Sequence, residues 1–256
     1  MMSDKKRIAI ITGASSGFGR LFAVELEKNL DLEEIWLIAR RTDKLEETAS
    51  MLERVKGTII IADLSTPEGI DLVVNKIELE NPSVRVLINN AGFGRSEEFI
   101  KGDEKYYSEM IDVNIKAPVL LTKRLLKYMS EGSKILNIAS SAAFAPLPYF
   151  AVYAASKAFL LNFSYALEQE FKDKDISVTC VCPGPAQTEF FKTKQKSVNG
   201  LKIEDPQKIV EKALRDMKSK KDISIYGYQA NLLRMISKIL PRKCLAWTAG
   251  KIKMPK

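Results

Sequence analysis

Short apolar runs alternate along the chain with longer segments in which apolar residues recur every three or four positions. The short runs are rich in isoleucine, valine and leucine, and such near-continuous runs predict strands buried on both faces, as in a parallel sheet. We expect seven of these strands, at residues 7–12, 34–39, 58–62, 85–89, 134–139, 176–181 and 222–226.

The longer segments between the strands carry the periodicity of helices. Strand and helix alternating at this spacing predict βαβ units with right-handed crossovers. The expected fold class is therefore α/β, with one doubly wound, Rossmann-type domain over residues 1–256 and a parallel sheet of about seven strands flanked by helices. The helices are expected near residues 18–29, 42–54, 67–79, 103–129, 152–172 and 205–218, with Asp43, Pro67, Asp103 and Pro206 as start signals.

The net charge of +8 is unevenly distributed along the 256 residues. Residues 191–256 hold 17 Lys and Arg against 5 Asp and Glu, so the preceding 190 residues carry a net charge of −4. The basic character therefore belongs to the C-terminal quarter and not to the fold as a whole. Because few aromatic residues are interleaved with these cations, we do not expect nucleic-acid binding.

Residues 228–256 are expected to form a basic, amphipathic C-terminal extension. Two interpretations are open for it. A terminal helix normally packs on the fold or on a partner subunit, which we favour; a basic amphipathic segment can also contact an anionic membrane or a lipid-like substrate. The apolar stripe consists of Leu232, Leu233, Met235, Ile236, Ile239 and Leu240.

The chain contains no histidine, which excludes every mechanism with an imidazole base, the Ser-His-Asp triad included. Its three cysteines, Cys180, Cys182 and Cys244, are too few for a disulfide framework, and we expect no metal site. The thiols fit a reducing compartment. The apolar run after the basic N-terminus is too short for a signal-peptide core, so we expect a cytoplasmic protein.

A glycine-rich turn follows the first expected strand and precedes the first expected helix, with the sequence TGASSGFG at residues 12–19. Such a turn lets backbone N–H groups approach a pyrophosphate, and the helix N-terminus adds a partial positive charge. A tight turn without a ligand is the alternative. The candidate cofactor-binding residues of this turn are Gly13, Ser15, Ser16, Gly17, Phe18 and Gly19.

Arg40 and Arg41 follow the second expected strand, where the adenosine ribose of a dinucleotide should lie. A carboxylate at that point would select NAD, whereas a guanidinium suits the 2′-phosphate of NADP(H). The alternative is an ordinary exposed basic turn. At the end of the third strand, Asp63 could bond the adenine amino group and Leu64 could flank the ring, although Asp63 could also cap the next helix.

Tyr153 and Lys157 are four residues apart in an expected helix and therefore share one face. A lysine ammonium beside a phenol favours the phenolate and lowers the tyrosine pKa, which suits a proton donor that works near neutral pH. The spacing alone is common on helices, so its meaning depends on the motifs around it.

Taken together, the motifs resemble the short-chain dehydrogenase/reductase family in their order and spacing, over at least residues 7–190. The resemblance implies a seven-stranded Rossmann-type sheet with the cofactor lying across the carboxyl ends of the strands. The residues that carry it are TGASSGFG (12–19), NNAG (89–92), Asn114, Ser140, YAASK (153–157) and PGP (183–185) with Thr188.

The resemblance also implies roles for individual residues. Tyr153 would supply the proton and Ser140 would polarise the substrate carbonyl, with Ser141 as its rival. Lys157 would lower the tyrosine pKa and bind the nicotinamide ribose, while Asn114 would hold a water that links Lys157 to solvent. Further cofactor contacts are expected from Asn90, Ala91, Gly92, Pro183, Gly184 and Thr188, the last bonding the carboxamide.

These features predict an NADP(H)-dependent oxidoreductase that transfers a hydride between the nicotinamide and a ketone, aldehyde or 3-oxoacyl-type substrate. The loop at residues 188–205, which begins with Phe190 and Phe191, is expected to shape an apolar substrate pocket. A homodimer or homotetramer is expected. The alternative function is a catalytically silent protein that binds or senses NADP(H) on the same fold.

Overall fold

A computed structural model describes residues 5–189, 197–198 and 201–251, and within them seven strands form one parallel sheet. The strand order is β3-β2-β1-β4-β5-β6-β9, so the winding direction reverses between β1 and β4. Ligands of doubly wound folds bind at this switch point, outside the carboxyl ends of the strands. The strands are β1 (Arg7–Thr12), β2 (Glu34–Ala39), β3 (Lys56–Ile61), β4 (Ser83–Asn89), β5 (Lys134–Ile138), β6 (Ser177–Val181) and β9 (Ile223–Ser224).

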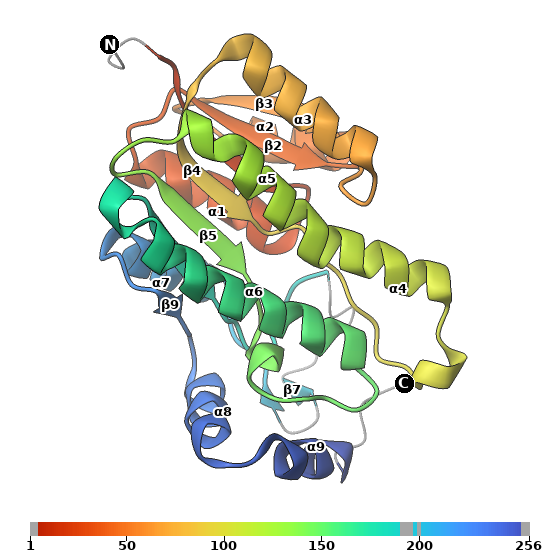
Figure 1. Cartoon of the computed structure of the whole chain (residues 1–256). Helices are drawn as coiled ribbons and strands as arrows, with labels where there is room; N and C mark the ends of the chain where they lie inside the picture. The colour runs from red at the N-terminus through yellow and green to blue at the C-terminus, as the bar shows by residue number, and fades with distance from the viewer. Residues whose placement is uncertain (1–4, 190–196, 199–200, 252–256) are drawn as a thin grey trace.

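The sheet is covered by helices on both faces, as the expected fold class requires (Figure 1). One apolar core lies between the sheet and the helices α3 (Pro67–Glu80), α5 (Ala117–Leu125) and α6 (Ala151–Glu170). The other lies between the sheet and α1 (Gly17–Asn29), α2 (Thr42–Ser50) and α7 (Pro206–Lys218). The prediction of a doubly wound parallel sheet is confirmed. A separate two-stranded ribbon pairs β7 (Ser197–Val198) with β8 (Leu201–Lys202).

The prediction of a single helix over residues 103–129 was wrong for the interior of that segment. The structure has α4 (Glu104–Ile111), a π-helical turn at Asp112–Lys116 and then α5. Pro118 has no N–H group with which to bond the carbonyl four residues earlier, so the regular helical ladder cannot continue through this point. The irregular turn contains Asn114.

Two further helices, α8 (Tyr228–Ile239) and α9 (Arg242–Lys251), follow the last strand of the sheet. Figure 1 shows them beyond the carboxyl ends of the strands, outside both helix layers. The expected apolar stripe packs only in part, because Leu233 and Ile236 are half-buried whereas Met235 and Ile239 are exposed. None of the helices within the described residues has the length and apolar character needed to cross a membrane.

Candidate active site

A cavity of about 1220 Å³ opens at the carboxyl edge of the sheet. It brings together residues that are up to 236 positions apart in the sequence, from Gly13 to Ala249. Of the candidate site residues, only Gly19 and Asn114 do not contribute to its wall. The wall contains Gly13, Ser15, Ser16, Gly17, Phe18, Arg40, Arg41, Asp63, Leu64, Asn90, Ala91, Gly92, Ser140, Tyr153, Lys157, Pro183, Gly184 and Thr188, together with Ser141.

The glycine-rich turn ends at Ser16, which is the extended residue before α1. The first turn of α1 contains no acidic side chain, so its N-terminal partial charge is left for an anion. Gly19 acts from behind the wall, because a Cβ atom there would lie 2.2 Å from the carbonyl oxygen of Gly13. Its lack of a side chain therefore lets the turn pack directly on the helix.

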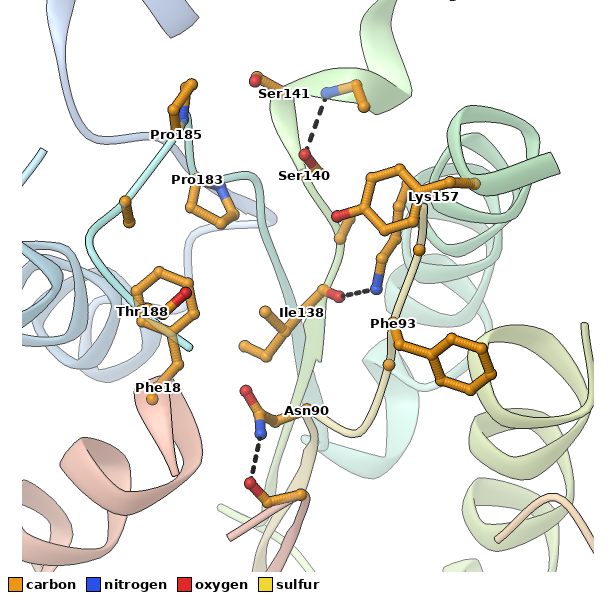
Figure 2. A pocket seen from close by; sticks show the side chains of 18 of the residues that line it. Phe18, Asn90, Phe93, Ile138, Ser140, Ser141, Lys157, Pro183, Pro185 and Thr188 are labelled. Carbon is orange, nitrogen blue, oxygen red and sulfur yellow. Dashed lines mark hydrogen bonds between the residues drawn. The ribbon is translucent and has the colours of Figure 1, made fainter. Parts of the chain in front are cut away.

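Thr12 and Asn90 hold this turn against the end of β4. The Thr12 hydroxyl oxygen accepts hydrogen bonds from the backbone N–H groups of Asn90 and Ala91, both at 2.9 Å. The Asn90 amide donates to the carbonyl oxygens of Thr12 and Gly13 at 2.9 and 3.1 Å (Figure 2). Sequence analysis did not single out Thr12, although its position directly before Gly13 is the signal that could have found it.

At the end of the cavity next to β2, Arg40 is paired with a carboxylate. Its Nη1 lies 3.5 Å from Oδ2 of Asp63, whose Oδ1 accepts bonds from the backbone N–H and the hydroxyl of Ser65. Burial raises the pKa of Asp63, but the bonds from Ser65 and the charge of Arg40 outweigh it and hold the pKa below its ordinary value. The cap of α3 is Thr66 and not Asp63, because the Thr66 hydroxyl accepts from Gly69.

Arg41 is paired as well, with a residue that sequence analysis missed. Its Nη2 lies 2.8 Å from Oε2 of Glu189 and 3.2 Å from the Ser15 hydroxyl. Bonds from Arg41 and Ser16 hold the pKa of Glu189 below its ordinary value. Glu189 thus reaches across the mouth of the cavity to the glycine-rich turn. No local pattern in the sequence places residue 189 beside residue 41.

At the opposite end, Tyr153 and Lys157 project from the first two turns of α6. Lys157 is 3% exposed, and its ammonium donates to the carbonyl oxygen of Ile138 at 2.9 Å (Figure 2). The ammonium lies 5.6 Å from the centroid of the Tyr153 ring. Burial lowers the pKa of Lys157 to about 8. The ammonium is therefore close to neutralisation under mildly alkaline conditions.

Burial raises the pKa of Tyr153 to about 12, and a hydrogen bond with the Ser140 hydroxyl acts in the opposite direction. The expected lowering of this pKa by Lys157 was wrong for this state of the protein, because desolvation dominates. Ser140 begins the short 3₁₀ turn Ser141–Phe144, and its Oγ accepts from the backbone N–H of Ala142 at 3.1 Å. The backbone N–H of Ser141 instead donates to the carbonyl oxygen of Pro183, and the Ser141 hydroxyl points away from Lys157 (Figure 2).

Asn114 lies behind this group and is completely buried. Its Oδ1 accepts from the backbone N–H of Phe93 at 3.1 Å, and its Nδ2 donates to the Phe93 carbonyl and the Ser156 hydroxyl, both at 3.0 Å. A Cβ atom on Gly92 would lie 3.0 Å from both Asn114 Oδ1 and Lys157 Nζ. The amide of Asn114 therefore holds the backbone of residues 92–93 beside Lys157.

A family model described as short chain dehydrogenase matches residues 7–199. The chain belongs to the short-chain dehydrogenase family. A very-long-chain 3-oxoacyl-CoA reductase of Anas platyrhynchos is 36% identical over 199 residues, which are 74% of this chain and 62% of that protein. A 17-beta-hydroxysteroid dehydrogenase type 3 of Mus musculus is 35% identical over 192 residues, 72% of this chain and 61% of that protein. The chain spans about three fifths of the length of these two relatives.

A solved short-chain dehydrogenase from Sphingobium yanoikuyae, in complex with NADPH, superposes on this chain with a TM-score of 0.77. The two are 26% identical, and the match covers 91% of this chain and 93% of the other. The fold and the family of the chain are thus shown by independent comparisons of sequence and structure.

The remaining wall of this short-chain dehydrogenase cavity is mostly apolar. Of the aromatic and aliphatic residues near the site, Phe93, Leu147 and Phe150 line it, whereas Phe144 and Tyr149 do not. Phe190 and Phe191 lie outside the described residues. The C-terminal helices α8 and α9 supply wall residues that sequence analysis did not assign to the site: Gln229, Ala230, Leu233, Leu245, Thr248 and Ala249.

Proposed function

We propose that the protein is an NADP(H)-dependent oxidoreductase that interconverts a carbonyl and an alcohol, with Tyr153 as the acid/base. One observation carries this proposal: the half-buried hydroxyl pair of Tyr153 and Ser140 lies beside the buried Lys157 in the same cavity as the glycine-rich turn. Membership of the short-chain dehydrogenase family supports the reaction type.

The residues around the cavity fit a nicotinamide dinucleotide. The turn at Gly13 and Gly17 and the N-terminus of α1 would hold the pyrophosphate. Pro183, Gly184 and Thr188 would cover the nicotinamide, and the Lys157 ammonium would bind its ribose. When bound, the cofactor would supply a hydride to the substrate carbon or accept one from it.

NADP(H) is favoured over NAD(H) by the chemistry of the donor set at the end of β2. Arg40 and Arg41 stand where an acid would select NAD, and each lines the cavity. Each guanidinium is also paired with a carboxylate, so a 2′-phosphate would have to exchange with Asp63 and Glu189. The NADPH complex of the Sphingobium yanoikuyae relative supports the same preference.

In the direction of reduction, Tyr153 would donate its phenolic proton to the substrate oxygen. Its pKa of about 12 keeps that proton in place at neutral pH. Ser140 would donate a second hydrogen bond to the same oxygen, where negative charge develops. The Lys157 ammonium would stabilise the phenolate that remains.

Asn114 would act through its backbone in resupplying this proton. The side-chain amide of Asn114 is already bonded to Phe93 and Ser156. Pro118, four residues later, has no N–H group to donate to the backbone carbonyl oxygen of Asn114 as in a regular helix. That carbonyl would then be the acceptor for a water between Lys157 and solvent, which restores the proton passed on by Tyr153.

The substrate would be an apolar ketone, aldehyde or 3-oxoacyl compound. The apolar wall formed by Phe93, Leu147, Phe150, Leu233 and Leu245 supports this class. The names of the two sequence relatives, a 3-oxoacyl-CoA reductase and a hydroxysteroid dehydrogenase, support it also. Assembly into a homodimer or homotetramer, a single domain and a cytoplasmic location stay predictions.

A panel of carbonyl compounds of increasing apolar length, mixed with NADPH and followed by loss of its absorbance, tests the proposal. Turnover should be seen with at least one of them and should be lost in Tyr153→Phe. If NADPH binds, as measured by its fluorescence, but no compound in the panel is reduced, the silent nucleotide-binding alternative gains and the proposed chemistry fails.

A further inference from the structure

The helices α8 and α9 form part of the cavity wall. Ala230 and Leu245 are buried, and both lie on the cavity wall. In Figure 1 neither helix belongs to the layers that cover the sheet. Each helix therefore has one side toward the cavity, and its opposite side lies outside the two helix layers that cover the sheet.

The opposite side of α8 exposes a row of large apolar side chains. Tyr228, Leu232, Met235 and Ile239 follow one another at intervals of four, three and four residues, which aligns them on one helix face. Met235 is 63% and Ile239 80% exposed. This row lies about half a turn from Ala230, so the buried and exposed sides of α8 are both apolar.

On α9 the outward side combines an aromatic ring with cations. Trp247 is 64% exposed, and the Lys251 ammonium lies 3.5 Å from the centroid of its ring. Lys243 lies on the same side of the helix, opposite Leu245. We call Tyr228, Leu232, Met235, Ile239 and Trp247 the outer face.

The charges that α8 and α9 themselves contribute around the outer face have one sign only. No aspartate or glutamate occurs between residues 223 and 256. Lys238, Lys243 and Lys251 are exposed, whereas Arg234 is directed to the Tyr165 hydroxyl at 3.2 Å and is not counted with them. A second copy of the same face would set these cations against one another, and neither helix offers a carboxylate to pair them. The face therefore suits an anionic surface better than self-association.

We propose that α8 and α9 bind the surface of an anionic lipid bilayer, with the outer face at the boundary between headgroups and acyl chains. Exposed apolar rows flanked by lysine are the pattern of helices that lie in this boundary. Lysine adds electrostatic attraction to acidic headgroups, and its long stem lets the charge reach them while the apolar row is buried. Because the same helices form part of the cavity wall, an apolar substrate dissolved in the bilayer lies next to the cavity. The surface does not depend on the proposed catalytic chemistry.

Co-sedimentation of the full chain with vesicles tests the proposal. We expect binding to vesicles of phosphatidylcholine with about one-third phosphatidylserine, weak binding to phosphatidylcholine alone, and release from the acidic vesicles as salt is raised. Absence of binding to the acidic vesicles, or equal binding to both kinds, overturns the proposal.

Two exposed sets of side chains then assign the binding to this surface. Met235→Ser with Ile239→Ser removes apolar contact and should weaken binding at least tenfold, as an order of magnitude. Lys238→Gln, Lys243→Gln and Lys251→Gln together should weaken it on the order of 100-fold at low salt. Unchanged binding in either variant contradicts the proposal.

Matched controls change the same chemistry elsewhere on the surface. Leu79→Ser alters another exposed apolar side chain, at 86% exposure on α3. Lys101→Gln, Lys105→Gln and Lys127→Gln together remove the same amount of charge from exposed positions. Both controls should bind like the parent protein. An equal loss in the charge control shows attraction by net charge only, and the proposal fails.

The two tryptophans provide a second readout. Trp36 is buried in the sheet, whereas Trp247 belongs to the outer face. Acidic vesicles should shift the emission of the parent protein to shorter wavelength, and Trp247→Phe should remove that shift while it keeps the signal of Trp36. A shift that persists in Trp247→Phe contradicts the proposed geometry. Sedimentation equilibrium that shows a dimer dispersed by Met235→Ser with Ile239→Ser assigns the face to self-association instead.

Discussion

The two ends of the cavity differ in how their charged groups meet solvent. At the proposed nicotinamide end, Lys157 is buried and Tyr153 is half-buried, and desolvation shifts the pKa of each in the direction that favours its neutral form. At the adenosine end, the Arg40 and Arg41 side chains are 66% and 46% exposed and are already paired with carboxylates. Burial therefore determines protonation at one end, and exchange of exposed ion pairs determines binding at the other.

This difference predicts how each end responds to change. A buried ionisable group interacts strongly with its surroundings, so removing it should have a large effect that salt hardly alters. An exposed ion pair is worth about 0–1 kcal/mol and is screened by salt. Substitutions at the nicotinamide end should thus change the rate greatly, and those at the adenosine end should change cofactor affinity moderately.

The largest effect is expected for Tyr153→Phe. The substitution removes the proton donor and leaves a ring of nearly the same shape, so carbonyl reduction should fall by about 10²- to 10⁴-fold. NADPH affinity, measured by fluorescence titration, should stay within about twofold of the parent protein. Turnover close to that of the parent would remove Tyr153 from the proposed role.

The paired serines provide a control for the same site. Ser140→Ala removes the hydroxyl that bonds Tyr153 and should slow reduction by about 10²-fold. Ser141→Ala removes a hydroxyl that points away from Lys157 and should change the rate little. Equal losses in the two variants would contradict the assignment of Ser140.

Lys157→Met should separate activity from stability. The folded pKa of about 8, against an ordinary value of 10.5, means that folding favours the neutral amine. Keeping Lys157 charged at pH 7 therefore costs the parent up to about 3 kcal/mol of stability. The methionine variant avoids this cost but loses the hydrogen bond to Ile138, which is worth about 1 kcal/mol. The variant should unfold at higher urea concentration than the parent at pH 7, while it loses reductase activity.

The sign of this effect is tested by its pH dependence. The parent should gain stability as pH rises from 8 to 10.5, because the folded protein binds fewer protons than the unfolded chain in that window. The advantage of Lys157→Met should shrink over the same window. Reduction by the parent should decline above about pH 8, where the ammonium is lost. A stability difference that does not vary with pH would refute the buried charge as its cause.

The fold was predictable from the sequence because most strands are near-continuous apolar runs, which are typical of a parallel sheet buried on both faces. The glycine-rich turn and the Tyr153–Lys157 pair were predicted from local patterns read together, and Ser140 was predicted from the resemblance to the short-chain dehydrogenase/reductase family. The helix break at Asn114 was missed because the apolar periodicity continues through Pro118, although a proline at that point cannot extend the hydrogen-bond ladder.

Other features depend on three-dimensional proximity, which no local pattern records. The pairing of Arg41 with Glu189 joins residues 148 positions apart. The direction of the Tyr153 pKa was wrong because sequence shows the neighbouring lysine but not the extent of burial. Likewise, which side of α8 lines the cavity follows only from where the sheet places that helix.

Arg40→Asp should have an intermediate effect, on cofactor choice. The parent should prefer NADPH over NADH by about ten- to hundredfold in kcat/KM at low salt, and less at higher salt. An aspartate at position 40 would repel a 2′-phosphate and accept bonds from free ribose hydroxyls, so the ratio should reverse. Arg40→Ala should give only a partial loss, because Arg41 remains. A parent that prefers NADH, or an unaltered ratio in Arg40→Asp, would refute phosphate recognition at this turn.

Glu189→Gln should have the smallest effect on cofactor affinity. Whether affinity rises or falls distinguishes two roles for the Arg41–Glu189 pair. The carboxylate bonds Arg41 at 2.8 Å and stays ionised, since that bond holds its pKa low. If it competes with the 2′-phosphate for Arg41, its removal should tighten NADPH binding by about two- to fivefold at low salt and leave NADH binding unchanged. Glu47→Gln is the matched control, because Glu47 pairs with Arg20 and does not line the cavity.

Weaker binding of both cofactors in Glu189→Gln would mean instead that the Arg41–Glu189 pair closes the cavity over the dinucleotide. Fluorescence titration of both cofactors at two salt concentrations decides between these roles.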